Sequence, residues 1–342
     1  MKQRAHAWTA LRALKLLDDS KKAPKLVELL SYYISDVWEG AWLPDTLIVD
    51  MQYGHIYKMD SDPEAMGFDI TKEGWLKTPY KKLKSKLKGN RLLLKYIKDQ
   101  PELKKPYKAH PDKGGHLPNR VIALSHAVAD MLKMSDYPLS FYAKKKKSSI
   151  YQKDLSAQSV KDLSLSPNFS ARQIALTLFM LSHYICDAYM PLHCDLRDYG
   201  GSKDKTRRLP KKLHPSIEAE WEKHFPEKEV LILHEYKKQS VDEAVKALPK
   251  RSIVKIDFKK EYSLSNKVPL ITQDEWQEMV YICRVSYALS RDWIKKPYKD
   301  VKALIRGISK AEFEKVTNYI FHDAVQSIAS MWYKAWKKFI SK

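Results

Sequence analysis

The chain has little glycine, little cysteine and no long apolar run, and each shortage excludes a class of protein. Its 342 residues include only 10 glycines and few alternating runs of valine, isoleucine and threonine, which argues against a fold built mainly from strands. No apolar run approaches the ~20 residues of a membrane-spanning helix. The first residues, MKQRAHAWTALRAL, lack the apolar centre and cleavage site of a signal peptide. The 3 cysteines are too few and too scattered for a disulfide framework, so we expect a cytoplasmic protein without a transmembrane segment.

The charge is strongly one-sided, because 62 Lys and Arg residues against 41 Asp and Glu give a net charge of +21. This excess indicates an anionic partner, such as nucleic acid or an anionic membrane surface. Lysine greatly outnumbers arginine, whereas sites that grip phosphate in a fixed geometry favour the arginine fork. The lysines of residues 81–105 and 144–147 are the expected nucleic-acid track, and a solvated lysine surface is an equally good interpretation.

Apolar residues make up 44% of the chain and recur over long stretches with the 3.6-residue period of helices. The sequence therefore predicts an all-α fold that forms a single large helical domain. Segment 171–190 is apolar almost all round, which predicts that it is the central helix. The polar stretch 195–212 is expected as a surface loop. Helices are predicted at residues 5–17, 25–38, 81–98, 120–134, 171–190, 241–248, 273–294 and 310–339, and one more should begin near His214.

Two pairs of side chains have the spacing of metal ligands on a helix. His183 and Asp187 stand four residues apart, as do His214 and Glu218, so each pair shares one helical face. His193 follows the first pair just after a proline. A single histidine is more often a packing or surface residue, but two such pairs within 36 residues indicate a site. Because zinc readily takes imidazole nitrogen and carboxylate oxygen, the sequence predicts a zinc centre.

Several short segments carry a resemblance to a known family. They are HAWTALRAL from His6, LPDTL, GHIYKMD around His55, SHYICDAYMPLH, and HPSIE from His214. Over about residues 5–225 the chain resembles the superfamily of zinc-dependent phospholipase C and S1/P1 nucleases, most specifically in SHYICDAYMPLH. The resemblance implies a helical catalytic domain of this type over residues 1–225. Residues 226–342 would be a C-terminal helical extension packed on the same domain.

The resemblance also implies a set of zinc ligands. One ion would be held by Asp45, His55, His183 and Asp187, a second by His193, His214 and Glu218, and a third by His6 with Asp187 as the bridge. Asp50 competes with Asp45 for its role, and Asp45 is preferred because it follows a proline, as in the superfamily. In secreted relatives the amine of a mature N-terminal tryptophan completes the third site. This chain offers Met1, five residues before His6, so the centre would hold two or three ions.

The function that the resemblance implies is hydrolysis of a phosphodiester. Paired zinc ions would activate water for attack on phosphorus while a third stabilises the departing alkoxide, and the expected catalytic carboxylates are Asp45, Asp187 and Glu218. The basic charge gives a slight preference for nucleic acid as substrate, whereas Glu218 as the last ligand and HIYKMD favour phospholipid. Two alternatives stay open. The protein would be a non-catalytic basic binding protein that retains the fold, although the full ligand set argues against this, or its zinc would be purely structural, although structural sites favour cysteine.

Overall fold

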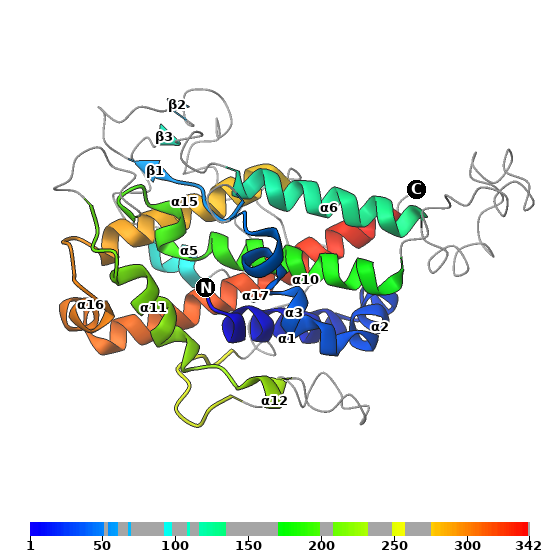
Figure 1. Ribbon diagram of the computed structural model, residues 1–342, viewed down its shortest axis with the longest axis horizontal. Helices are drawn as coiled ribbons and strands as arrows, with labels where there is room; N and C mark the ends of the chain where they lie inside the picture. The colour runs from blue at the N-terminus through cyan, green and yellow to red at the C-terminus, as the bar shows by residue number, and fades with distance from the viewer. Residues whose placement is uncertain are drawn as a thin grey trace, which may run out of the picture.

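In the computed structural model of the protein, the described residues are 1–50, 54–60, 68–69, 92–97, 108–109, 116–134, 170–198, 208–231, 248–256 and 275–340. They are mostly helical and form a bundle (Figure 1). The α-helices are α1 (Gln3–Ser20), α2 (Pro24–Tyr32), α3 (Val37–Gly40), α5 (Leu92–Ile97), α6 (Leu117–Met134), α10 (Ala171–Ala188), α11 (Leu213–Glu222), α12 (Lys228–Leu231), α15 (Glu275–Trp293), α16 (Val301–Ile308) and α17 (Lys310–Ile340). Shorter turns are η1 (Ile34–Asp36), η2 (Pro44–Ile48) and η5 (Pro191–Cys194).

Helix α10 lies at the centre of the bundle, where it packs against α1, α6, α15 and α17. It begins with a capping box, in which Ser170 and Gln173 satisfy each other's backbone N–H groups. Its second half is fully buried, because every residue from 181 to 188 is buried. The indole of Trp332 on α17 donates a hydrogen bond to the carbonyl oxygen of Leu178 at 2.8 Å. The prediction of a central helix here is confirmed.

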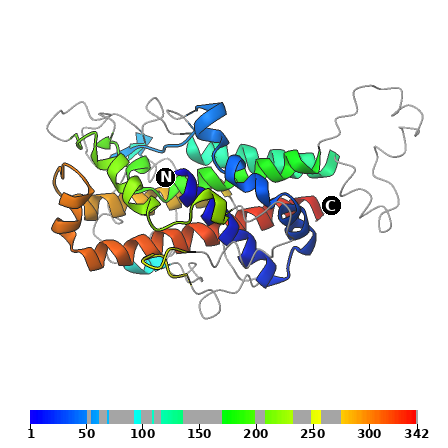
Figure 2. The same ribbon diagram turned by 60° about the horizontal axis from the view of Figure 1, so that its bottom comes forward.

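The C-terminal helices α15 and α17 are part of the same bundle. α17 packs against α1, α6 and α10, and α15 packs against α6, α10 and η5 (Figures 1 and 2). In both views the N-terminus lies beside α10 and α11 rather than at the edge of the molecule. The division of the chain at residue 225 stays a prediction, but the helices that follow it are not a separate layer.

Some predicted elements differ from the structure. The helix expected over residues 25–38 ends at Tyr32, because the backbone at Tyr33 leaves the helical conformation, and Asp36 then pairs with Arg172 of α10 at 2.7 Å. Helix α16 was not predicted. The expected surface loop 195–212 is wrong for residues 195–198, which are buried. The expected helices at 81–98 and 241–248 fall outside the described residues, apart from residues 92–97, which are helical, and residue 248, which is not.

A small sheet lies beside the bundle. Its strands β1 (Met59–Asp60), β3 (Lys108–Ala109) and β2 (Phe68–Asp69) pair antiparallel in the order β1–β3–β2. Met59 also forms an isolated parallel bridge with Asp195, just after η5. Among the described helices, none combines the length and the apolar character needed to cross a bilayer.

Candidate metal centre

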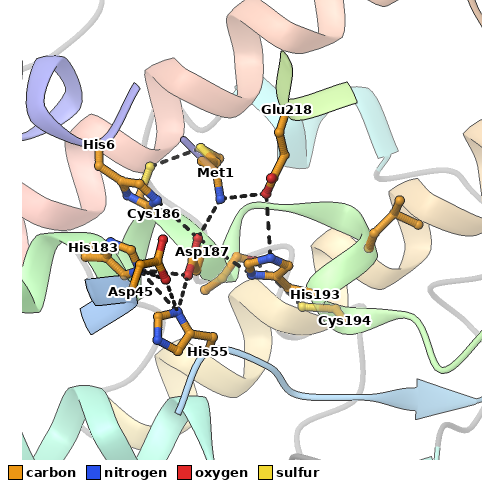
Figure 3. A network of polar contacts seen from close by, with 12 residues as sticks. Met1, His6, Asp45, His55, His183, Cys186, Asp187, His193, Cys194 and Glu218 are labelled. Atoms are coloured by element: carbon orange, nitrogen blue, oxygen red, sulfur yellow. Dashed lines mark hydrogen bonds and ion pairs between the residues drawn. The ribbon is translucent and has the colours of Figure 1, made fainter. Parts of the chain in front are cut away.

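The predicted ligands come from separate segments of the chain and meet in one cluster (Figure 3). His6 lies on α1, Asp45 in η2, His55 before β1, His183 and Asp187 on α10, His193 in η5, and His214 and Glu218 on α11. Their ligand atoms form three groups, each within 4.8 Å: His6, His183 and Asp187; Asp45, His55 and His183; and His193, His214 and Glu218. The structure thus brings together all the metal ligands that the sequence predicts.

Local structure explains why α10 and η5 deliver ligands to one place. His183 and Asp187 are one turn apart on α10, so their side chains lie on the same face. α10 ends at Ala188, and Pro191, which cannot continue an α-helix, opens the tight turn η5. Within this turn the backbone N–H of His193 donates to the carbonyl oxygen of Met190 at 3.0 Å. The reversal returns His193 to the cluster instead of carrying it beyond the helix end.

Asp187 lies at the centre of the cluster and is 1% exposed. Its Oδ2 lies 2.8 Å from His55 Nδ1 and 3.2 Å from His183 Nε2. Its Oδ1 lies 3.4 Å from His6 Nε2 and 3.6 Å from His193 Nδ1. Each oxygen of one carboxylate therefore faces different imidazoles, which is the arrangement that a bridging metal ligand needs.

The geometry distinguishes Asp45 from Asp50. Asp45 Oδ1 lies 3.5 Å from both His55 Nδ1 and His183 Nε2. Asp50 Oδ1 lies 2.9 Å from Nε2, the other nitrogen of the His55 ring, and it accepts a hydrogen bond from the hydroxyl of Tyr184 at 3.0 Å. Asp45 therefore lies among the candidate ligands, whereas Asp50 lies behind His55 and orients its ring.

A close approach of α3 to α10 orients His183. A Cβ atom on Gly40 would lie 2.8 Å from the Cβ of Phe179, so only glycine allows the two helices to pack at this distance. The carbonyl oxygen of the next residue, Ala41, accepts a hydrogen bond from His183 Nδ1 at 2.7 Å. Because Nδ1 donates this bond, Nε2 is the ring nitrogen that faces the cluster and that a metal ion would bind.

The group of His193, His214 and Glu218 is built in the same way. His214 Nε2 lies 3.1 Å from Glu218 Oε1, and His193 Nε2 lies 3.9 Å from the same oxygen. His214 Nδ1 lies 2.9 Å from Asp198 Oδ2. Asp198 is 4% exposed and contacts the ammonium group of Lys58 at 3.3 Å. Neither residue was predicted, since Asp198 lies in a stretch that is polar in sequence and no spacing rule marks it.

The amino group of Met1 lies between two of the groups. It is 2.9 Å from Asp187 Oδ1 and 2.9 Å from Glu218 Oε1 (Figure 3). The side chain of Met1 is buried and contacts the thiol of Cys186 through its sulfur at 3.2 Å. The amine thus occupies the part of the cluster next to His6, where the resemblance implies the third ion.

Carboxylates raise the pKa of two of the buried histidines. Burial by itself lowers the pKa of His183, but Asp187 and Asp45 more than offset this and raise it to about 9. Burial likewise lowers the pKa of His214, and Glu218 with Asp198 raises it to about 9. Both imidazoles are therefore protonated at neutral pH, and a metal ion that binds them has to displace these protons.

Unpartnered nitrogens show that the residues fit a metal ion. Among the described residues, both ring nitrogens of His6 lack a hydrogen-bond partner, and so does Nδ1 of His193. His6 is 1% exposed and stacks on His183 with ring centroids 3.9 Å apart. A buried polar group left unsatisfied costs about 1–3 kcal/mol, and a cation bound by these nitrogens would remove that cost. The imidazole and carboxylate donors suit a divalent metal ion.

The remaining histidines within the described residues lie elsewhere. His126 is exposed on α6, and His322 is buried beside Asp323 on α17.

Comparisons of the chain with protein-family models, curated proteins and solved structures gave no match. The function therefore has to be inferred from the cluster itself.

Proposed function

We propose that this protein is a zinc-dependent phosphodiester hydrolase of the phospholipase C and S1/P1 nuclease type. The observation that carries the proposal is Asp187, whose two oxygens face different imidazoles of a buried cluster. The mostly helical architecture and the order of the ligands along the chain support the same type of fold. The three groups contain carboxylates and no cysteine, whereas purely structural zinc sites favour cysteine.

Each part of the cluster has a task in such a reaction. Zinc ions held by these groups would supply activated water and offset negative charge on the phosphoryl oxygens. Asp187 fixes the spacing between the groups, and Asp45 and Glu218 provide the negative charge that retains cations in a buried site. The carboxylates of Asp50 and Asp198 orient the histidines in front of them. The reaction needs no nucleophilic side chain from the protein.

Two features favour different substrates. The net charge of +21 favours nucleic acid. Directly after Asp45, however, the side chains of Leu47, Ile48 and Val49 are 76, 37 and 60% exposed, and exposed aliphatic side chains beside the site favour phospholipid. The expected lysine tracks at residues 81–105 and 144–147 lie outside the described residues, except for residues 92–97. Both substrates therefore belong in the test.

The test begins with metal analysis of protein purified without added zinc, followed by hydrolysis of bis(p-nitrophenyl) phosphate. We expect two or three zinc ions per chain, loss of hydrolysis on chelation and recovery with zinc. His193→Ala should abolish hydrolysis, and the matched control His126→Ala, which removes an exposed histidine, should not change it. Single-stranded DNA and phosphatidylcholine are then compared as substrates. A fully zinc-loaded protein that hydrolyses none of the three would refute the proposal.

A further inference from the structure

Lys58 is a buried residue whose ammonium group contacts the backbone next to one candidate ligand and the carboxylate that contacts another. Its Nζ donates to the carbonyl oxygen of Leu192 at 2.6 Å and lies 3.3 Å from Asp198 Oδ2. Leu192 immediately precedes His193, and Asp198 Oδ2 contacts His214 Nδ1 at 2.9 Å. One ammonium group therefore joins the supports of two ligands that belong to the same group.

The backbone around Lys58 is fixed to the same segment. The N–H of Tyr57 donates to the carbonyl oxygen of His193 at 3.1 Å, and the N–H of Leu196 donates to the carbonyl oxygen of Met59 at 3.1 Å. These bonds lie on both sides of Lys58. Its side chain is thereby held between η5 and Asp198, and Asp198 in turn contacts His214 of α11.

The energetic cost of this arrangement argues for a purpose. Lys58 is 2% exposed and Asp198 is 4% exposed, and removing an ammonium and a carboxylate from water costs several kcal/mol per ion before their attraction repays it. An apolar pair of similar volume would pack the same space at no such cost. The charged pair instead fixes the orientation of the His214 ring. The Asp198 carboxylate accepts a hydrogen bond from His214 Nδ1, so Nε2 faces Glu218.

We infer that Lys58 and Asp198 are positioning residues for the metal ion of the group His193, His214 and Glu218. The inference rests on the metal centre of the proposed function but not on its reaction or substrate. Lys58 holds Asp198 and the carbonyl beside His193 at a fixed separation, and Asp198 holds the ring of His214. The group is therefore preformed for a cation before the cation arrives.

The experiment counts bound zinc and measures its affinity by competition with a chromophoric chelator in the full chain. Asp198→Asn and Lys58→Met should each weaken the binding of one ion by about 10–100-fold, so that this ion is lost to the chelator while the others stay. The matched control is Asp323→Asn. Asp323 is 1% exposed and lies 3.0 Å from His322 Nδ1, so the control makes the same change in a buried Asp–His pair outside the cluster, and it should keep every ion.

Three results would overturn the inference: unchanged zinc affinity in Asp198→Asn, loss of all ions together, or equal loss of one ion in the control. If the Lys58→Met protein does not fold, the nearly isosteric Asp198→Asn variant still tests the inference. Circular dichroism then confirms that this variant keeps its helices. The ¹⁵N shifts of the His214 ring in the zinc-loaded protein give a second readout, since a residue that served stability alone would leave them unchanged. Zinc counting needs no substrate, so a protein that binds zinc normally but hydrolyses nothing would refute only the hydrolase proposal.

Discussion

Two buried Asp–His pairs in this protein have nearly the same geometry and different surroundings. Asp198 Oδ2 lies 2.9 Å from His214 Nδ1, and Asp323 Oδ1 lies 3.0 Å from His322 Nδ1. The other nitrogen of His214 faces the carboxylate of Glu218 at 3.1 Å. The other nitrogen of His322 faces the side-chain amide of Gln326 at 3.2 Å. A carboxylate that faces the second ring nitrogen attracts a cation, either a proton on the ring or a metal ion, whereas an amide satisfies the ring without one.

The second pair has a structural task. The carboxylate of Asp323 accepts hydrogen bonds from the backbone N–H groups of Leu92 and Leu93 at 2.9 and 3.0 Å. These are the first N–H groups of α5, which have no partner inside their own helix. Asp323 therefore joins α5 to α17. The comparison teaches that a buried Asp–His pair does not by itself indicate a metal site, and that the group facing the second ring nitrogen distinguishes the two pairs.

The largest effect is expected at the centre of the cluster. Asp187→Asn should abolish phosphodiester hydrolysis and lower the zinc content by more than one ion per chain, because the carboxylate faces two groups of ligands. Zinc analysis and hydrolysis of bis(p-nitrophenyl) phosphate measure both effects. Loss of a single ion with activity retained would show that Asp187 is not a bridge.

A smaller loss of hydrolysis is expected on changing Glu218, the carboxylate that distinguishes the two Asp–His pairs. Glu218→Gln gives His214 an amide neighbour, as His322 has, and should release the ion of this group while the helical core stays folded. An ion that contributes several kcal/mol of charge stabilisation accounts for about a 100-fold change in rate or more. Steady-state kinetics with circular dichroism test this, and wild-type activity would refute the assignment of Glu218 as a ligand.

In the scaffold pair the expected effect is on stability alone. Asp323→Asn removes a charged acceptor of backbone hydrogen bonds and should lower the free energy of unfolding by about 1–3 kcal/mol. Urea unfolding measures the change as a lower midpoint at constant slope. Hydrolysis per folded molecule should match that of the wild type. A loss of activity beyond the unfolded fraction would mean that the two pairs are coupled.

The smallest expected effect is the release of protons from the protein when zinc binds. The pKa of His183 and of His214 is raised to about 9 in the metal-free protein, so at pH 7 both rings carry protons that zinc displaces. Zinc affinity should therefore rise with pH up to about 9 and weaken as pH falls, because protons compete for the same nitrogens. Calorimetry in buffers of different ionisation enthalpy measures the protons released. Binding without proton release at pH 7 would contradict this.

The sequence was sufficient where the signal is local. The four-residue spacings of His183 with Asp187 and of His214 with Glu218 predicted their shared faces, because helix geometry depends only on neighbours in the chain. The break after α10 followed from a proline for the same reason. The sequence preferred Asp45 to Asp50 only because a proline precedes it, and the structure placed the two carboxylates on opposite sides of the His55 ring.

Local spacing rules could not predict contacts between residues that lie far apart in the sequence. The contact between Lys58 and Asp198 joins residues 140 positions apart, and Asp198 belongs to a stretch whose composition predicted a surface loop. Burial of that stretch follows from Arg197, which contacts Asp195 at 2.7 Å and donates to the carbonyl oxygen of Ile294 at 2.7 Å. The charges that suggested exposure are paired with each other, and the hydroxyl of Ser290 on α15 donates to Asp195 at 2.7 Å.

By itself the sequence determined that the chain is helical, which histidines and carboxylates are candidates for a metal, and how they are spaced within each helix. These properties depend on side-chain type and on the period of the helix. Only the tertiary structure decided which candidates share a group, that Asp187 faces two of them, and which buried Asp–His pair lies beside such a group. These features depend on how α1, α10 and α11 pack against one another. Each imidazole ring has two nitrogens, and the group that faces the second nitrogen comes from elsewhere in the fold.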